Sequence, residues 1–525
     1  MKRYFFLLAT VALSCFSIAQ EIVKENLGVT INTSYAETKP VISPDGKTLF
    51  FARQFYPDNI NGEKDAQDIY FSQKIDGVWS KSLNMGAPMN DRYPNGVSSI
   101  SPDGNMILVL NAYDNGNVKN CASIAHKEGN FWGAPKKITI RNFYNSSAYV
   151  DYFISNNEQQ LLLTIERDDA FGDQDIYVCF RMNESLWTEP VNLGPVINTQ
   201  MAEFSPFLAA DNKTLFFASQ GHGSYGGSDI FYAKRLDDTW QNWTDPVNLG
   251  SDINSDGFEG YYTIPASGEY AYFVSDKGGI EDSKDIFRAT IPYRFLPEPV
   301  VLMSGHVINR ITHEHVEASI YYEAIENEKE MGEAVSKKED GSYKIVLPRG
   351  FTYRYYAQVD GFFGVPALMD EIDNNEYQEI ESNLYLIPIA TDNVIPVFDI
   401  YFSEITDKIL PNSVPELERI VKMLNDNPRI KIEVTAFTNK HDSSQHNLEL
   451  SNKRAESICN YLISNNIPAQ RLQPNGLGSK KFVDDYIKVS KEIDTMNRIE
   501  IKILATNWKM PPVESKVDSV AKSSN

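Results

Sequence analysis

Residues 43–53 read "SPDGKTLFFAR", a turn followed by an apolar strand, and this pattern returns at intervals of about 55 residues. The further copies are "SPDGNMILVLN" (101–111), "SNNEQQLLLTI" (155–165), "AADNKTLFFAS" (209–219) and "PASGEYAYFVS" (265–275). In four of the five units a second strand follows that begins near an Asp, as in "QDIYFS" (67–72). The first four units then carry a strand that contains Trp. Groups of short strands that repeat at a fixed period, with no helix between them, are typical of a β-propeller.

The five repeats predict about five blades, and a divergent sixth blade stays open as an alternative. The fifth unit lacks the Trp strand, but the segment "EIVKENLG" (21–28) matches "TEPVNLG" (188–194), which ends a later unit. We therefore expect the N-terminal strand to complete the last blade. Such pairing closes the ring and leaves no open sheet edge.

The segment "GHGSYGGSDIFY" (221–232) resembles the active-site elbow of a serine hydrolase around Ser224. That elbow needs a strand before the Ser and a helix directly after it. Here the following residues, "SDIFYAKR" (228–235), alternate as a strand, and His222 occupies a position where the elbow needs Gly. No hydrolase domain with a downstream Asp and His follows. We predict that Ser224 is a loop residue and that the protein is not an enzyme.

The "SPDGKTLFF" and "GGSDIFY" stretches resemble the PD40 family of WD40-like (TolB-like) propellers, and the resemblance covers residues 26–291. It implies a propeller domain over 20–294 that contacts other proteins. Loops such as "DDAFGDQD" (168–175) are acidic enough to suggest calcium, but they lack the ligand spacing of an EF-hand. Solvated turns explain them better, so we expect no metal and no cofactor.

The N-terminal segment "MKRYFFLLATVALSCFSIAQ" (1–20) has a basic start and an apolar stretch. Ser17 and Ala19 fit the −3 and −1 positions of a secretory cleavage site, which predicts a signal peptide over 1–19. Lipoprotein processing at Cys15 is the alternative. No later stretch approaches the about 20 apolar residues of a membrane span. The sequence therefore predicts export to the periplasm or the outer membrane.

Chain length, net charge and cysteine count limit the number of domains and the kinds of partner that we expect. A chain of 525 residues divides into about three domains. The formal net charge of −22 argues against nucleic acid or an anionic membrane surface as the main partner. After cleavage three cysteines would remain, an odd number without a CxxC motif, which favours buried thiols over disulfides or zinc. They are Cys121, Cys179 and Cys459.

Residues 298–389 fall outside the repeat and read as strands separated by turns. The order "SGHV" (304–307), "DGSYKIVLPRG" (340–350) and a Tyr-rich strand resembles the carboxypeptidase regulatory-like β-sandwich, a family of non-catalytic modules. The resemblance implies a spacer or docking domain. His313 and His315 would share a strand face and could ligate a metal, but no third ligand is in view, so an exposed turn is favoured.

From residue 394 the pattern changes to alternating strands and helices. Apolar residues recur with helical period in "SVPELERIVKMLNDN" (413–427), and "LELSNKRAESICNYLISNNI" (448–467) reads as a second amphipathic helix. Strands are predicted around 394–402, 429–437 and 497–504. This βαβαβ order predicts a compact α/β domain over 394–506, followed by a polar tail over 507–525 that we expect to be disordered.

This last domain resembles the OmpA-like peptidoglycan-binding family. The resemblance rests on "VTAFTNKHDSSQHNLELSNKRA" (434–455), "GLG" (476–478) and "NRIEI" (497–501). In that family a motif Asp and a motif Arg hold the diaminopimelate of the cell-wall stem peptide, and the Arg pairs with a ligand carboxylate in a geometry that Lys does not reproduce. The resemblance implies a peptidoglycan site made of Thr438, Asn439, Asp442, Asn447 and Arg454.

Several positions depart from the family pattern. Asn439 stands where the family has its Asp, so a charge is missing, and Ala436 and Phe437 replace the preceding Gly and His. Losing a charge-assisted hydrogen bond costs about 1.5–3 kcal/mol, or about ten- to hundredfold in affinity. Asp442 is positioned in the sequence to compensate in part. The alternative is a protein-interaction or adhesion scaffold whose OmpA-like domain has lost cell-wall binding.

The order of propeller, regulatory-like sandwich and OmpA-like domain is similar to that of the peptidoglycan-linked periplasmic component of type IX secretion machinery. That relative also has a helical-repeat domain and a lipid anchor ahead of its propeller, and this sequence shows no helical repeat there. The resemblance implies a non-catalytic envelope protein that is anchored to peptidoglycan and presents its propeller to protein partners.

Overall fold

The computed structural model describes residues 22–113, 122–129, 131–280, 283–325, 329–370, 376–403, 406–438, 444–479 and 498–508. The chain forms two compact units. The first consists of Met1–Leu302 with Ile345–Arg349 and Asp373–Glu379, and the second holds the remaining residues. Cys15, the expected signal peptide, Cys121 and the predicted C-terminal tail from residue 509 onward lie outside the described residues.

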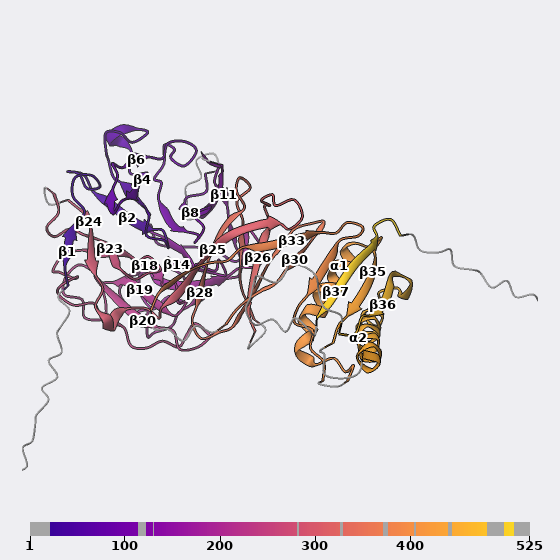
Figure 1. The fold of residues 1–525 in the computed structure, drawn as a ribbon. Helices are drawn as coiled ribbons and strands as arrows, with labels where there is room; N and C mark the ends of the chain where they lie inside the picture. Colours follow the sequence, from indigo (N-terminus) through magenta and orange to yellow (C-terminus); the bar gives the residue numbers. More distant parts are fainter. Residues whose placement is uncertain are drawn as a thin grey trace, which may run out of the picture. The chain divides into compact units, whose positions relative to one another are not determined.

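The first unit contains five antiparallel sheets that follow one another along the chain (Figure 1). The first sheet holds β2 (Glu37–Ile42), β3 (Thr48–Arg53), β4 (Asp68–Ile75), β5 (Val78–Trp79) and β6 (Leu83–Asn84). The second holds β7 (Val97–Ile100), β8 (Met106–Leu110), β9 (Ala122–Glu128), β10 (Phe131–Trp132) and β11 (Lys136–Lys137). The third holds β13 (Asp151–Ile154), β14 (Gln160–Ile165), β15 (Asp175–Phe180) and β17 (Val191–Asn192).

The fourth sheet holds β18 (Glu203–Leu208), β19 (Thr214–Ser219), β20 (Asp229–Lys234) and β21 (Val247–Asn248). The fifth holds β22 (Glu259–Thr263), β23 (Tyr270–Ser275), β24 (Asp285–Thr290) and β1 (Lys24–Asn26). A short parallel pair joins β12 (Thr139–Ile140) to β16 (Leu186–Trp187). In the fifth sheet Lys24 lies opposite Ala289, so the expected pairing of the N-terminal strand with the last repeat is confirmed.

The five sheets contact one another in a cycle through their first strands. Strand β2 contacts β7, β7 contacts β13, β13 contacts β18, β18 contacts β22, and β22 contacts β2. Five buried hydrophobic clusters accompany these contacts, and each combines side chains from two neighbouring sheets. The second strand of each repeat is therefore covered on both faces, which explains why its sequence is continuously apolar rather than alternating.

A polar network recurs beside four of the sheets. The sequence Asn-x-Gly-x-x-x-Asn occurs at 26–32, 84–90, 192–198 and 248–254. The first Asn of each copy donates a hydrogen bond to the buried Asp that begins the third long strand, as Asn192 does to Asp175 at 2.8 Å. The second Asn forms hydrogen bonds with the backbone N–H and carbonyl of the residue that follows this Asp, as Asn198 does with Ile176. The network satisfies buried backbone groups at the same place in each repeat.

Ion pairing and aromatic contact hold the centre of the cycle. Lys39, Ser205 and Tyr261 occupy equivalent β-bulges and have φ values of 51°, 46° and 56°, a left-handed conformation that costs energy for residues other than Gly. The Lys39 ammonium pairs with Asp151 and lies 4.4 Å from the Tyr261 ring centre. Burial lowers the pKa of Lys39, but Asp151 and Tyr261 outweigh burial and raise it overall. These residues line a small cavity of about 60 Å³.

The second unit contains a β-sandwich and an α/β domain. One sandwich sheet has the strand order β28-β25-β33-β30, with β32 beside β25, and the other has the order β27-β26-β29-β31. The strands are β25 (Val300–Asn309), β26 (Ser319–Ala324), β27 (Lys329–Val335), β28 (Ser342–Pro348), β29 (Tyr353–Gln358), β30 (Phe362–Val365), β31 (Ala367–Met369), β32 (Gln378–Glu381) and β33 (Leu384–Pro388). The boundary between the two compact units falls within β25 and β28.

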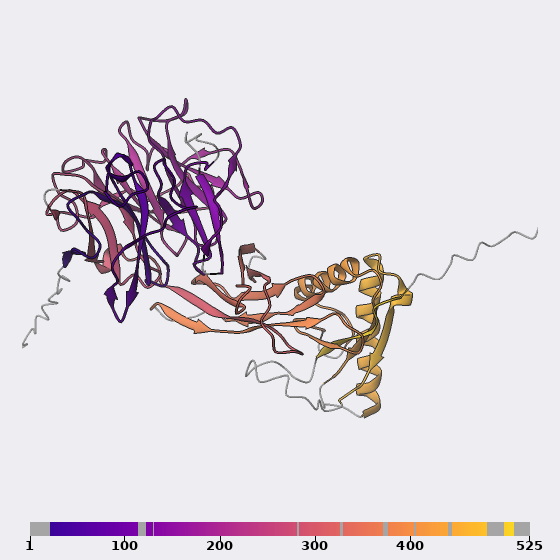
Figure 2. The same cartoon turned by 90° about the horizontal axis from the view of Figure 1, so that it is seen from above.

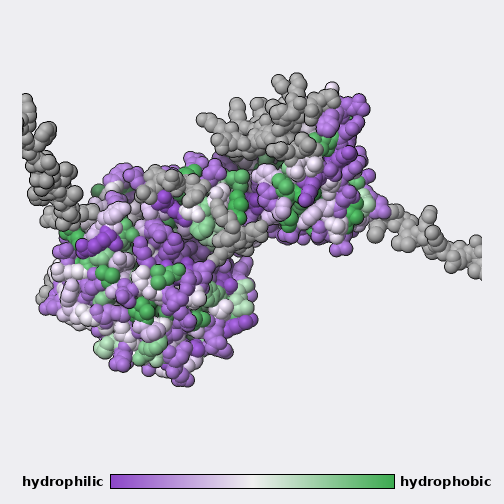
Figure 3. All heavy atoms as spheres, turned by 90° about the horizontal axis from the view of Figure 1, so that it is seen from below, coloured by the Kyte–Doolittle hydropathy of each residue, from purple (hydrophilic) through white to green (hydrophobic). Residues whose placement is uncertain are grey.

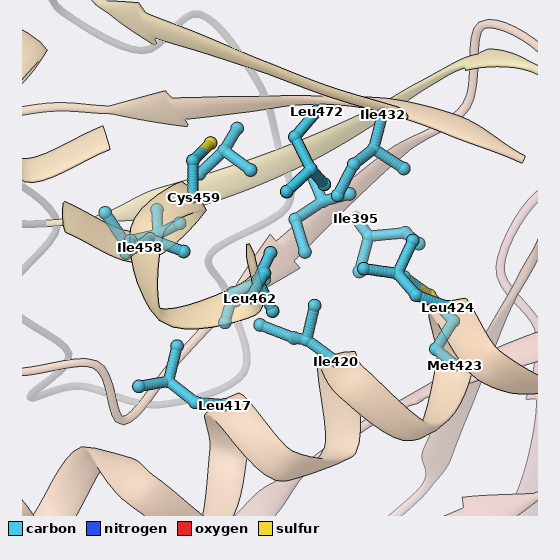
Figure 4. Close-up of a cluster of buried hydrophobic side chains, with 14 of the residues drawn as sticks. Ile395, Leu417, Ile420, Met423, Leu424, Ile432, Ile458, Cys459, Leu462 and Leu472 are labelled. Carbon is cyan, nitrogen blue, oxygen red and sulfur yellow. The ribbon is translucent and has the colours of Figure 1, made fainter. Parts of the chain in front are cut away.

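The α/β domain is a four-stranded sheet with strand order β34-β37-β35-β36 and two helices on one face (Figures 1 and 2). Its elements are β34 (Val394–Val397), α1 (Val414–Asp426), β35 (Lys431–Ala436), α2 (Ser444–Ser464), β36 (Leu472–Gly476) and β37 (Ile499–Ala505). Figure 4 shows Ile420 of α1, Leu462 of α2 and Ile432 of β35 in one buried cluster. The cluster also includes Phe363 and Ile387 of the sandwich, so the two domains share a hydrophobic core.

The expected βαβαβ order was incomplete, because β36 is an additional strand. It pairs parallel with β35 at the edge of the sheet, from Ile432 opposite Leu472 to Ala436 opposite Gly476. Its sequence, "LQPNG", has no alternation and contains Pro474. Pro is tolerated only in strands that lie at an edge, which is why the pattern gave no strand signal.

Four short 3-10 turns complete the described elements, at Gly62–Lys64, Tyr293–Phe295, Pro411–Ser413 and Ala469–Arg471. Within the part of the chain that the structure describes, neither helix combines the length and the apolarity needed to cross a membrane. On the face drawn in Figure 3, hydrophilic residues cover most of the surface and hydrophobic residues form small separate groups. This distribution agrees with the strongly acidic composition.

Removing Lys39 tests the central ion pair. In Lys39→Met the Asp151 carboxylate stays largely buried without its cation, and we expect a loss of about 3–5 kcal/mol in the free energy of unfolding. Lys39→Met/Asp151→Asn should recover most of the loss. Urea unfolding followed by Trp fluorescence measures it, since five of the six Trp residues belong to the first unit. Additive losses in the double variant would contradict this account.

Glu203 should make the stability of the first unit depend on pH. Its side chain is fully buried, and burial raises its pKa from 4.5 to about 7 although Thr199 and Ser219 donate hydrogen bonds that oppose the shift. As pH rises above 4.5 the unfolded chain releases this proton first, so stability falls until about pH 7 and then levels off. The fall is at most about 3 kcal/mol for this residue.

Glu203→Gln should remove most of that fall, because the amide does not ionise. Urea unfolding at pH 5 and pH 8 measures the change, with Glu269→Gln at an exposed position as the control. An unchanged pH dependence in Glu203→Gln, or an equal change in the control, would show that Glu203 is not the group responsible.

Candidate functional site

Helix α2 brings together most of the motif residues of the C-terminal domain. Asn447, Ser451 and Arg454 are spaced so that they lie on one face of the helix, and all three are buried. Further along the same helix the buried residues are apolar and join the core, among them Ile458 and Leu462. The buried polar residues in the first half of α2 therefore lie outside the hydrophobic core.

The "GLG" segment lets β36 and the turn after it lie close to α2. Gly476 donates to the Asn452 side chain at 2.8 Å, and Gly478 donates to Ser451 Oγ at 2.9 Å. A Cβ atom on Gly476 would stand only 2.3 Å from the Asn452 backbone nitrogen. Gly478 has φ +60° and its added Cβ would lie 3.3 Å from Leu448 N, so both positions require Gly.

Thr438 connects the end of β35 to this cluster. Its backbone N–H donates to the Gly478 carbonyl at 3.0 Å, and its hydroxyl donates to the Asn447 carbonyl at 3.4 Å. The structure thus places Thr438 and Asn447 side by side. Asn439 and Asp442, the two other predicted site residues, lie outside the described residues. The segment that contains them joins Thr438 to the start of α2.

Arg454 is held by a short hairpin that precedes α1. Its Nε donates to the Thr406 carbonyl at 3.1 Å, and its guanidinium carbon lies 4.8 Å from the centre of the Phe402 ring. Ser457, one turn further along α2 from Arg454, donates to the Asp407 carboxylate at 3.1 Å. Phe402, Thr406 and Asp407 belong to residues 401–403 and 406–410, the two described segments that we call the 401–410 hairpin.

The backbone of the 401–410 hairpin is paired like a β-hairpin. Phe402 bridges to Ile409, Ser403 N–H donates to the Lys408 carbonyl, and Leu410 N–H donates to the Tyr401 carbonyl. This pairing was not predicted, because the pattern over 394–402 indicated one continuous strand. The signal available in the sequence was the polar residues Ser403, Thr406 and Asp407 after that apolar run.

Burial makes the positive charge of Arg454 energetically costly. The side chain is 4% exposed. Burial lowers the pKa of the Arg454 guanidinium below its usual range, and Asp407 opposes part of that shift. Arg nevertheless stays charged in proteins, and a buried charge is costly unless anions or hydrogen bonds compensate it. The Thr406 carbonyl and the Asp407 carboxylate supply part of this compensation.

The "NRIEI" motif contains a second buried arginine, Arg498, directly before β37. Arg498 donates to Glu500 at 2.9 Å, and its guanidinium lies 3.9 Å from the Phe437 ring centre. Phe437 N–H donates to the Arg498 carbonyl. Phe437 occupies the position of the family His, and in this chain it covers Arg498 instead of providing a polar side chain.

Three other sequence candidates have ordinary structural roles. Ser224 lies before strand β20, and its hydroxyl donates to the carbonyls of Ser219 and Gly221. His313 sits in a turn with φ +61°, while His315 stacks on His306 with ring centres 5.2 Å apart. The two histidines of "THEH" therefore do not form a shared site. Among the described residues no group of three or more His, Cys, Asp or Glu side chains is placed to hold a metal ion.

Residues 401–492 match the OmpA family, and no curated protein matches the chain. Solved structures with similar parts include an outer membrane protein of Borrelia burgdorferi B31, with 25% identity over 21% of this chain and 87% of that chain and a TM-score of 0.17. The peptidoglycan-associated lipoprotein of Burkholderia pseudomallei has 20% identity over 20% and 87%, with a TM-score of 0.17. TolB of Acinetobacter baumannii has 12% identity over 50% and 55%, with a TM-score of 0.32.

The match to the OmpA family begins at the 401–410 hairpin and extends past α2 and the "GLG" segment. It thus includes every described residue that holds Arg454 or Thr438 in place. The C-terminal part of the chain is an OmpA family domain.

Gly476→Ala tests the close approach of β36 to α2. The added methyl group overlaps the backbone of α2, and we expect a loss of about 1–3 kcal/mol in local stability. Amide hydrogen exchange across α2 measures the loss. Gln473→Ala, an exposed change in the same strand, is the control. Equal exchange in the two variants would contradict the packing described here.

Proposed function

We infer that this is a non-catalytic protein of the cell envelope that attaches to peptidoglycan through its C-terminal domain. One observation carries the proposal: Arg454, at the position of the motif arginine, is buried on the same face of α2 as Asn447 and Ser451, and its Nε is fixed by the Thr406 carbonyl. A buried guanidinium in a fixed orientation is suited to a carboxylate ligand. The stem peptide of peptidoglycan carries such carboxylates on its diaminopimelate.

The hydrogen bond to Thr406 constrains how Arg454 would bind. Because Nε donates to a backbone carbonyl, the side-on geometry that uses Nε and one Nη is already occupied. A ligand carboxylate would therefore approach the Arg454 guanidinium from a side other than that of Nε. Asn439 would accept or donate one neutral hydrogen bond beside it. We expect weaker binding than in family members that have the Asp.

The five sheets of the first unit are proposed to be the blades of a propeller that presents loops to protein partners. The cycle of contacts between first strands and the five clusters between neighbouring sheets support this arrangement. Together with the sandwich, the order of domains supports a role in outer-membrane or type IX secretion machinery. The export signal would deliver the chain to the periplasm.

A second candidate function follows from Asn439. If the missing carboxylate abolishes binding, the C-terminal domain serves as a structural module and the protein is a scaffold for protein interaction or adhesion. This candidate shares the fold and the location of the first. It differs in predicting no affinity for the cell wall.

Sedimentation with purified peptidoglycan sacculi separates the two functions. We expect the purified protein to bind, Arg454→Ala to lose binding, and Arg454→Lys to bind about tenfold more weakly because an ammonium cannot form the paired contact. Lys453→Ala removes the same charge from the neighbouring, exposed position and should bind normally. Circular dichroism verifies folding of each variant. Absence of binding, or binding that does not change in Arg454→Lys and Arg454→Ala, would favour the scaffold.

A further inference from the structure

A buried charge cluster joins the sandwich to the segment that leads into the 401–410 hairpin. Arg354 of β29 is 5% exposed. Its Nε donates to Asp399 at 3.2 Å, and its Nη1 donates to Glu323 at 2.8 Å. Asp399 stands two residues before the hairpin and accepts a second hydrogen bond, at 2.9 Å, from the hydroxyl of Tyr401. Both oxygens of the Asp399 carboxylate are thus used, one toward the sandwich and one toward the hairpin.

Asp399 also has an uncommon backbone conformation. Its φ is +62°, a left-handed value that residues other than Gly adopt at a cost unless their surroundings impose it. Here the surroundings are the Arg354 guanidinium and the Tyr401 hydroxyl. The conformation turns the chain from β34 into the hairpin, so the ion pair with the sandwich fixes the direction in which the hairpin leaves the sheet.

The other end of the hairpin is fixed to the sandwich as well. Leu410 is followed by the turn that begins α1, and on α1 Arg419 donates to the Gly364 carbonyl of the sandwich at 2.5 Å. The Arg419 guanidinium lies 4.0 Å from the Tyr356 ring centre and pairs with the buried Glu416 at 2.7 Å. Ser413 bonds both backbone groups of Tyr401, which ties the two ends of the hairpin together.

The hairpin carries the groups that touch α2 at the candidate site. Thr406 accepts from Arg454, Phe402 lies against its guanidinium, and Asp407 accepts from Ser457. A continuous path of direct contacts therefore runs from Arg354 through Asp399 and the hairpin to Arg454. The steps are hydrogen bonds, an ion pair and a ring contact, joined by the backbone of the hairpin, and all lie within the second unit.

We propose that the β-sandwich is a positioning element of the peptidoglycan site, and that Arg354 and Asp399 orient Arg454 for its ligand through the 401–410 hairpin. The proposal rests on the proposed function of the C-terminal domain. It assigns the sandwich the role of positioning the binding site rather than that of a spacer. Arg354 and Asp399 are positioning residues, because neither touches the ligand.

Two variants that each remove one carboxylate from Arg354 test the proposal. Asp399→Asn keeps the side-chain shape and a residue type that tolerates positive φ, but an amide NH2 replaces one of the two oxygens that accept from Arg354 and Tyr401, so one of these contacts is lost. Glu323→Ala removes the other carboxylate completely, yet Glu323 has no contact with the hairpin among the interactions of the described residues. The two variants therefore change the same arginine and differ in their link to Arg454.

The first measurement is the affinity of the purified protein for a soluble stem peptide that contains diaminopimelate, by titration calorimetry. We expect Asp399→Asn to bind about three- to tenfold more weakly and Glu323→Ala to bind like the unmodified protein. The second measurement is amide hydrogen exchange at Ser403 and Leu410, whose N–H groups close the hairpin. Exchange there should be faster in Asp399→Asn only, with the exchange of α1 and β35 unchanged.

The possible outcomes distinguish the two proposals. If the unmodified protein binds and the two variants bind equally well or equally poorly, the positioning role is overturned and the proposed function stands. If Asp399→Asn alone weakens binding and loosens the hairpin, the positioning role is supported. If the unmodified protein does not bind the stem peptide at all, the proposed function is overturned, and the positioning role in binding is overturned with it.

Discussion

The hydrogen bond from Arg454 Nε to the Thr406 carbonyl is the interaction on which the account of the C-terminal domain depends. It sets the plane of a guanidinium that is almost completely buried. Desolvation makes an unmatched charge costly, and it also strengthens attraction to any anion that reaches the site, because little water is left to screen it. Orientation and desolvation together distinguish this arginine from the many surface ion pairs that contribute little.

The rest of the second unit can be understood as support for that arginine. The core beneath the sheet holds α1 and α2 in place, and it extends into the sandwich through Phe363 and Ile387. Glycines at 476 and 478 bring the edge strand against α2. The hairpin, which lies near the N-terminal end of the domain, contacts α2 through Thr406 and Asp407. An exposed linker between sandwich and α/β domain would leave the hairpin without its fixed ends.

The first unit uses a different principle, which is repetition. Each repeat contributes one apolar strand that is covered on both sides, and four of the five also contribute a buried Asp and an Asn pair that satisfies the neighbouring backbone. No single repeat buries its own hydrophobic faces, so stability comes from contact between neighbours. The cost of the left-handed bulges at Lys39, Ser205 and Tyr261 is offset by the ion pair and ring contact that they create.

Local patterns predicted much of this structure. The repeat spacing located the five strand groups, the match between residues 21–28 and later units predicted the pairing of β1 with β24, and helical periodicity located α1 and α2. The prediction failed where residues act only through distant partners. Nothing near Asp399 in the sequence indicates Arg354, 45 residues earlier, and "LQPNG" becomes a strand only beside β35. The bulges and the buried Glu203 were missed for the same reason.

The most direct test of the central claim is a determined structure of the protein with a diaminopimelate stem peptide bound. The account predicts a ligand carboxylate in contact with the Arg454 guanidinium, with Nε still bonded to the Thr406 carbonyl and the 401–410 hairpin unmoved. A ligand bound elsewhere on the domain, or an Arg454 that leaves Thr406 to reach its ligand, would contradict it.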